Sequence, residues 1–140
     1  MKTLLKTAFN FCLLFVLFSV QLSAQTLTDT LKQNLINLEE KDRIPALITL
    51  SNQYLFCDAE QAKMYANEAL SLSQKFKYPP GIAQSFYHLG FSNYRIGNYP
   101  EALDYLSKAE KKWNDLKIYD EAAVARNLTA IVYYYIGRIS

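Results

Sequence analysis

Residues 83–97 read AQSFYHLGFSNYRIG, and residues 123–137 read AVARNLTAIVYYYIG. Both stretches begin with alanine, carry tyrosine at the twelfth position and end in Ile-Gly, and they lie forty residues apart. The same interval relates the alanines and the tyrosine of residues 62–69 to those of residues 102–109. Self-similarity at a fixed period of this size is typical of a solenoid, in which one supersecondary unit is copied and stacked. Because a single unit cannot bury its apolar face alone, neighbouring copies must cover one another.

The apolar residues are spaced as in helices. Leu47, Leu50 and Tyr54 recur at intervals of three and four, and no stretch alternates between apolar and polar residues over the length of a strand. With four Gly and four Pro among 140 residues, the composition disfavours a turn-rich all-β fold. We therefore predict an all-α fold, an α-solenoid of antiparallel helical hairpins with repeats of 39–40 residues.

Local signals predict where the first helices begin. Thr28 and Asp29 can cap an N-terminal helix, and the charged run at 39–42 interrupts the apolar pattern, so we expect a connecting loop there. A second helix is expected to begin near Ile44 with Pro45 in its first turn. Proline is tolerated at that place because the first N–H groups of a helix have no helical partners.

The remaining helices are delimited by a cap and by prolines. Asp58 followed by Gln61 forms a capping box, which predicts the start of a third helix. The run YPPG at 78–81 is expected to end that helix, because consecutive prolines cannot continue the hydrogen-bond ladder. Further helices are expected over 82–96, over 100–116 and over 121–136.

The first 24 residues have the layout of a secretory signal peptide. Lys2 and Lys6 precede an almost wholly apolar run at 9–20, and Ala24 offers a small residue for cleavage. The apolar run is shorter than the roughly 20 residues that a membrane-spanning helix needs. We therefore expect an exported chain, periplasmic or extracellular, that spans no membrane unless the N-terminal segment is retained.

Charge and cysteine content narrow the function classes. Once Lys2 and Lys6 are set aside with the signal segment, 13 of the 15 basic residues remain against 13 acidic residues, so the net charge is zero. Without a basic stripe, binding of nucleic acid lacks its electrostatic basis. Cys57 is the only cysteine beyond the signal segment, so an intramolecular disulfide is excluded and packing alone must hold the fold.

The repeats resemble the tetratricopeptide repeat family. The best copy places Phe86 three residues before Leu89-Gly90, and its second helix carries Ala102 and Ala109. The matching residues are Leu47, Leu50, Ser51, Tyr54, Ala62, Ala66 and Ala69 in a second copy, and Thr129, Ala130, Tyr133 and Gly137 in a partial third copy. The resemblance divides the chain into an N-terminal helix at 25–41 and repeats at 42–80, 81–119 and 120–140, the last of them incomplete.

The resemblance implies a protein–protein interaction scaffold that binds a peptide or a partner domain on the concave face made by the first helix of each repeat. Carried over to this chain, the family's groove positions are Asn52, Gln84, Tyr87, Phe91, Tyr94, Arg95, Asn127, Ile131, Tyr134 and Tyr135. Tyrosine and arginine combine contact area with polar groups, which suits partner recognition. Packing against the adjacent repeat is the alternative interpretation of the tyrosines. A second functional interpretation is the periplasmic sensory region of a larger signal-transduction protein, such as a histidine kinase or a transcriptional regulator.

An alternation of small and large side chains gives the repeat a physical basis. Small residues let two helix backbones approach closely, and large residues such as Leu89 and Trp113 fill the space around each contact. The predicted close contacts are at Ser51, Ala62, Ala69, Gly90, Ala102, Ala109 and Ala130.

The third repeat is expected to stop halfway. Residues 138–140 correspond to residues 98–100, which form the entry to a second helix. The apolar side of the third repeat's first helix is therefore expected to remain uncovered. The sequence thus leaves self-association through this incomplete repeat open as an interaction.

Catalysis is not expected. The sequence has no Gly-rich phosphate loop, nucleophile elbow or metal motif, and no cofactor is implied. The competing hypothesis from a different class is a hydrolase that uses Cys57 or His88, the single histidine. An activated thiol needs a lowered pKa, and the sequence offers Cys57 no identifiable base.

Overall fold

The computed structural model describes residues 28–139, which are mostly helical. The chain divides into two compact units, Met1–Ile36 and Asn37–Ser140. A first helix covers residues 28–37 of the described chain. The predicted signal peptide at 1–24 lies outside the described residues.

The described part of the second unit is built from α2 (Glu40–Tyr54), α3 (Ala59–Lys75), α4 (Pro79–Ile96), α5 (Tyr99–Asp115) and α6 (Tyr119–Ile139). No strand occurs among residues 28–139. The predicted all-α fold is therefore confirmed. Over the same residues, no helix has both the length and the apolar content that crossing a membrane requires.

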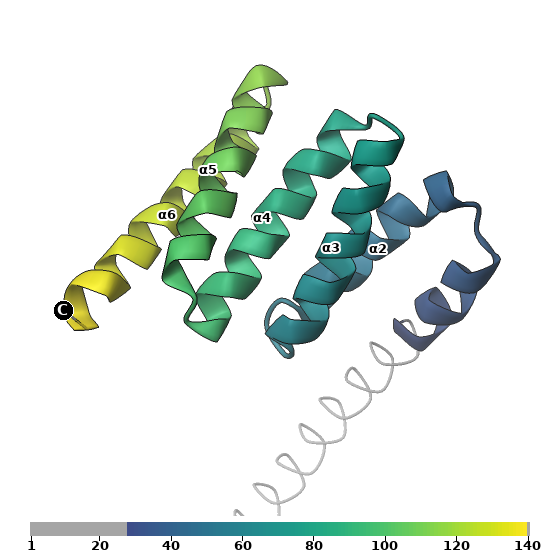
Figure 1. Ribbon diagram of the computed structural model, residues 1–140, viewed down its shortest axis with the longest axis horizontal. Coiled ribbons are helices and arrows are strands. Elements are labelled where there is room, and N and C mark those ends of the chain that lie inside the picture. Colours follow the sequence, from purple (N-terminus) through teal and green to yellow (C-terminus); the bar gives the residue numbers. More distant parts are fainter. Residues whose placement is uncertain (1–27, 140) are drawn as a thin grey trace, which may run out of the picture. The chain divides into compact units, whose positions relative to one another are not determined.

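Each helix packs against its neighbours in the sequence, as the succession from α2 to α6 in Figure 1 shows. The connecting turns have only two to four residues, so consecutive helices run antiparallel. α4 also contacts α2 and α6, whereas α3 and α5 do not contact each other. The even-numbered helices therefore form one row, in which α3 bridges α2 and α4, and α5 bridges α4 and α6.

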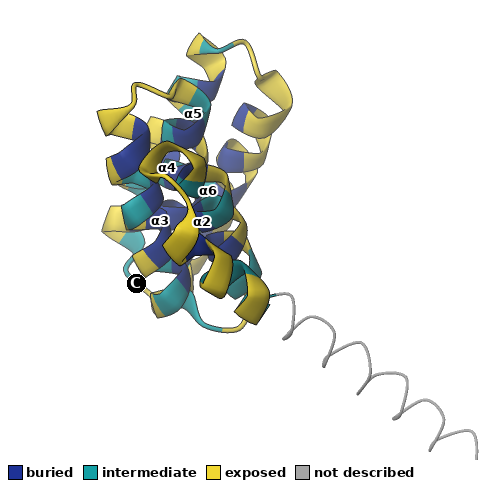
Figure 2. Ribbon diagram, turned by 90° about the vertical axis from the view of Figure 1, so that its right-hand side faces the viewer, coloured by how far each residue is buried: buried dark blue, intermediate teal, exposed yellow. Residues whose placement is uncertain are grey.

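The core lies between the helices, where the buried residues gather in Figure 2. Six of the seven small residues predicted at close contacts are buried there: Ser51, Ala62, Ala69, Gly90, Ala102 and Ala109. A Cβ atom at Gly90 would lie 2.7 Å from Leu106 Cγ, so only glycine lets α4 and α5 approach this closely. At the equivalent position of α2, the Ser51 hydroxyl donates to the carbonyl of Ala62 at 2.8 Å.

Ala130 is the exception among the predicted close contacts. It is exposed on α6, because no helix covers that side of α6 within the described residues. The buried side of α6 carries Ala122, Ala125, Leu128 and Val132, which pack against the preceding hairpin. The prediction of a close contact at Ala130 is therefore wrong for residues 28–139.

The start of α2 differs from the prediction of a loop at 39–42. The carbonyl of Glu39 accepts from the N–H groups of Asp42 at 2.9 Å and Arg43 at 3.1 Å, so the helix begins at Glu40. Two acidic residues of this run, Glu40 and Asp42, lie in the first turn, where carboxylates interact favourably with the helix dipole. Pro45 consequently lies inside the helix rather than in its first turn, on an exposed side.

The turn between α3 and α4 also corrects a prediction. α3 ends at Lys75, before the YPPG run at 78–81, and the two prolines open α4 instead of closing α3. Proline fits the first helical positions because it has a preset φ and no N–H to satisfy. The predicted start of α3 is confirmed, because the Asp58 carboxylate accepts from the N–H of Gln61 at 3.0 Å.

Three helices end with the same hydrogen-bond pattern. In the turn that follows each of them, one residue adopts left-handed backbone angles: Lys77 (φ 50°) after α3, Gly97 (φ 89°) after α4 and Lys117 (φ 61°) after α5. The following N–H groups donate back into the last turn, from Tyr78 to Ser73 at 2.8 Å, from Asn98 to Asn93 at 2.8 Å and from Ile118 to Trp113 at 2.9 Å. These bonds satisfy carbonyls that the helix ends would otherwise leave free.

Candidate functional site

A cavity of about 280 Å³ lies where the even-numbered helices meet α5. It is lined by Ile48, Thr49 and Asn52 of α2, Gln84, Tyr87 and His88 of α4, Trp113 of α5 and Glu121 of α6. Three of these, Asn52, Gln84 and Tyr87, are residues that the sequence predicted at a partner-binding groove. The repeat thus brings side chains from α2 and α4 to one place, although they lie more than thirty residues apart in the sequence.

The aromatic part of the cavity wall is fixed by packing. The rings of Tyr87 and Trp113 lie with their centroids 5.5 Å apart. Trp113 is only 3% exposed and packs against Ala109 and Ala122 in the core. Burial and the charge of Glu121 together raise the pKa of the Tyr87 phenol, so Tyr87 is neutral at neutral pH. The wall is therefore an uncharged aromatic surface.

His88 contributes a neutral group to the same cavity. Its side chain is buried, and burial lowers the pKa of the imidazole from 6.5 to about 4. Its Nδ1 atom is enclosed and has no hydrogen-bond partner among the described protein atoms. His88 therefore carries no charge at neutral pH.

A row of aromatic rings leads away from the cavity. Tyr87 contacts Phe91 with a centroid distance of 6.2 Å, and Phe91 contacts Tyr94 at 6.1 Å. From there the row continues to Tyr135 at 5.6 Å and on to Tyr134 at 5.8 Å. The row thus joins four predicted groove residues, Phe91, Tyr94, Tyr134 and Tyr135, to the cavity.

The inner and outer members of the row differ in burial. Phe91 and Tyr94 are half-buried and pack against the core around Leu106 and Val132, whereas Tyr134 is 62% exposed. Packing against neighbouring helices therefore accounts for the inner rings, and partner recognition by this row stays a prediction. The inner rings pack against neighbouring helices on one side and face outward on the other.

Three predicted groove residues take other positions. The guanidinium of Arg95 donates to the carbonyl of Phe56 at 3.1 Å, which ties α4 to the turn between α2 and α3. Asn127 and Ile131 are exposed on α6 and contribute neither to the cavity nor to the contacts between the aromatic rings. In α4 the equivalent residues, Tyr87 and Phe91, are held against α5 and α6.

Several residues of the site were not predicted from the sequence. Ile48 stands one repeat before Tyr87, so the same carry-over would have found it. Thr49 stands one repeat before His88, which was not among the predicted groove residues. The exposed ring of Phe56 reaches Phe91 from the turn after α2, with a centroid distance of 5.2 Å. No repeat position pointed to Phe56, because turns vary in length between the copies.

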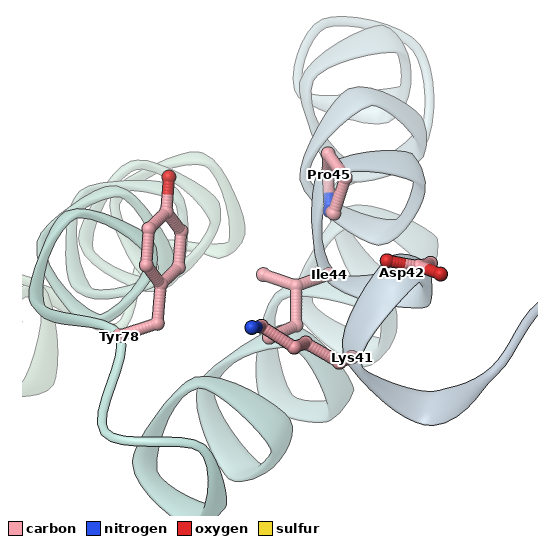
Figure 3. A pocket seen from close by; sticks show the side chains of 5 residues that line it. All are labelled: Lys41, Asp42, Ile44, Pro45 and Tyr78. Atoms are coloured by element: carbon pink, nitrogen blue, oxygen red, sulfur yellow. The ribbon is translucent and has the colours of Figure 1, made fainter.

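A second cavity of about 280 Å³ lies between the start of α2 and the turn before α4. Figure 3 shows Tyr78 across this cavity from Lys41 and Ile44, with Pro45 and Asp42 completing the lining. The lining combines one ammonium, one carboxylate and one phenol, so it prefers neither a positively nor a negatively charged ligand. It contains none of the predicted groove residues.

The residues of the competing hydrolase hypothesis lie in different surroundings. Cys57 is free and exposed in the turn between α2 and α3, and its thiol lies 3.5 Å from the carbonyl oxygen of Gln53. It does not line the cavity that contains His88. In the part of the chain that the structure describes, no three His, Cys, Asp or Glu side chains are grouped to hold a metal ion.

Comparison with models of known protein families finds no match for this chain, and comparison with curated proteins finds none either.

Proposed function

We propose that this chain is a protein-interaction scaffold of the tetratricopeptide type, which binds a peptide or a segment of a partner protein along the row formed by α2, α4 and α6. The observation that carries the proposal is the convergence of Asn52, Gln84 and Tyr87 on one cavity. These residues were selected by their positions in the repeat alone, and they belong to two different helices.

The packing of the helices supports a repeated hairpin architecture. α4 contacts both α2 and α6, and each of α3 and α5 bridges two members of that row. α3 and α5 contact only the helices next to them in the sequence. The side of the row of α2, α4 and α6 that faces away from α3 and α5 is therefore left uncovered by them. A row of this kind presents its surface to a ligand over several repeats.

The chemistry of the row suits an extended peptide. The partly exposed rings of Phe91, Tyr94 and Tyr135 give apolar contact area, and the tyrosine hydroxyls give polar contacts at low entropic cost. At the Tyr87 end of the row of aromatic rings, the cavity can hold one side chain of the peptide. Binding by such a surface requires no chemical step. Export of the chain, expected from residues 1–24, is part of the same proposal.

The proposal can be tested by selecting peptides from a random display library against the full chain. Peptides that bind should lose at least tenfold in affinity when Asn52 and Tyr94 are both replaced by alanine, because central contact residues dominate the binding energy. Met64→Ala is the matched control, since Met64 is 55% exposed on α3, outside the row. Peptides that lose affinity for the Met64 variant and keep it for the double variant would contradict the proposal.

A further inference from the structure

One carboxylate gives the cavity between α2, α4, α5 and α6 its charge. Glu121 is the only lining residue that is charged at neutral pH, because His88 is neutral there. Its side chain is exposed to solvent and lines the cavity together with Tyr87, whose pKa its charge helps to raise. An anionic ligand group would be repelled by this carboxylate, and a cationic group would be attracted.

Glu121 also lacks a basic partner within the described residues. Four other acidic side chains, Glu40, Glu68, Asp104 and Glu110, each form an ion pair with a lysine or an arginine. No such pair involves Glu121 over residues 28–139. Its carboxylate is therefore available to a cation that comes from another molecule.

The walls next to Glu121 offer further contacts to a cation. The half-buried ring of Tyr87 carries negative potential on its face, which attracts ammonium and guanidinium groups. Trp113, which is only 3% exposed, supports this ring from the core at a centroid distance of 5.5 Å. The side-chain amides of Asn52 and Gln84 provide carbonyl oxygens that can accept from N–H donors. These groups come from α2, α4 and α5, and the packing of α4 against the other two brings them to one cavity.

The size of the cavity is sufficient for a single large side chain. Pockets for whole small molecules usually have volumes of about 300–1,000 Å³, whereas this cavity has about 280 Å³. A planar guanidinium can stack on an aromatic ring while its N–H groups bond to a carboxylate and to amide oxygens. A lysine ammonium is more strongly hydrated and makes fewer directed bonds.

We propose that this cavity binds an arginine side chain of the partner segment, with Glu121 as its counter-charge and with the ring of Tyr87, supported by Trp113, as its aromatic wall. This inference rests on the proposed scaffold function for the origin of the arginine. The recognition itself depends only on the cavity.

The test titrates the full chain with N-acetyl-argininamide and follows the indole N–H resonance of Trp113, which is the single tryptophan. We expect a saturable shift of this resonance. N-acetyl-citrullinamide, which has nearly the same shape and no charge, should give no saturable shift, and N-acetyl-lysinamide should bind more weakly than the arginine compound. Glu121→Gln should weaken binding of the arginine compound about threefold to tenfold, because Glu121 is partly screened by solvent.

Asp120→Asn is the matched control. Asp120 and Glu121 both lie in the first turn of α6, so both substitutions remove one carboxylate from the same helix end. Only Glu121 lines the cavity. Circular dichroism of both variants checks that the fold is kept, and the Asp120 variant should bind the arginine compound as the unchanged chain does.

An equal response to the citrulline compound, an unchanged affinity in Glu121→Gln, or the absence of a saturable shift would each overturn the inference. These outcomes leave the scaffold proposal standing, because that proposal is tested separately by selected peptides and the Asn52 and Tyr94 variant. Selected peptides that fail to use the row would in turn refute the scaffold proposal without affecting the titration with the arginine compound.

Discussion

At the scale of single residues, His88 couples the fold to pH. It is the only histidine of the chain, and burial lowers the pKa of its imidazole from 6.5 to about 4. Below about pH 6.5 the unfolded chain binds a proton on this imidazole that the folded chain does not bind. This residue therefore reduces stability as the pH falls from about 6.5 to about 4, and the loss levels off below that range.

We expect the free energy of unfolding to decrease by about 2 kcal/mol between pH 7 and pH 5 through His88 alone. Urea unfolding followed by circular dichroism at the two pH values measures this decrease. His88→Gln removes the titrating group and keeps a polar side chain, so its decrease should be much smaller. A variant that loses as much stability as the unchanged chain would assign the pH dependence to other groups.

At the scale of the helices, the ends of α3 and α5 carry a strained residue where many proteins have glycine. Lys117 has φ 61°, a conformation that costs an L-residue roughly 1–2 kcal/mol. Glycine has no such cost, although it gives the unfolded chain more freedom. We expect Lys117→Gly to raise the free energy of unfolding by about 0.5–1 kcal/mol.

Lys111 provides a control for that prediction. It is exposed in the interior of α5, where glycine is unfavourable, so Lys111→Gly should lower stability by about 1 kcal/mol. Thermal and urea unfolding of the two variants therefore should shift in opposite directions. Two shifts of the same sign would contradict the role assigned to the left-handed position.

The sequence predicted the existence of the helices better than their ends. The repeat and the helical spacing of residues such as Leu47 and Leu50 indicate helices whatever their bounds. The early start of α2 depends on backbone hydrogen bonds to the Glu39 carbonyl. Charged residues are compatible with these bonds, but they do not by themselves predict a helix start. The helix ends at Lys77 and Lys117 were not predicted, because lysine, unlike glycine, does not indicate left-handed backbone angles.

At the scale of the whole array of α2 to α6, the site could be predicted only in part. Asn52, Gln84 and Tyr87 could be selected by their positions in the repeat, because α2 and α4 turn equivalent faces to the same cavity. Trp113 and Glu121 join the cavity through the packing of α5 and α6 on α4, which no single repeat encodes. Residues contributed by a neighbouring repeat can be recognised only when the stacking is known.

The same stacking makes the stability of the array local. Each helix from α2 to α6 contacts only its neighbours in the sequence and, for the even-numbered helices, the next even-numbered helix. A substitution that weakens one interface is therefore expected to destabilise mainly the helices that form it. Trp113 is 3% exposed and holds α6 to α5 with Ala122 and Ala125. We expect Trp113→Ala to lower the free energy of unfolding by about 3–5 kcal/mol, as for other large buried side chains.

Hydrogen exchange resolved by peptide should locate that loss. In the Trp113→Ala variant, amide protection should fall first in α6 and in the second half of α5, while α2 and α3 keep most of theirs, because the buried cluster around Trp113 contains residues of α4, α5 and α6 and none of α2 or α3. Phe76→Ala, which truncates an aromatic ring that is 37% exposed at the end of α3, serves as the control and should leave the protection of α6 unchanged. A uniform loss of protection from α2 to α6 after Trp113→Ala would show that the helices unfold as one cooperative unit rather than interface by interface.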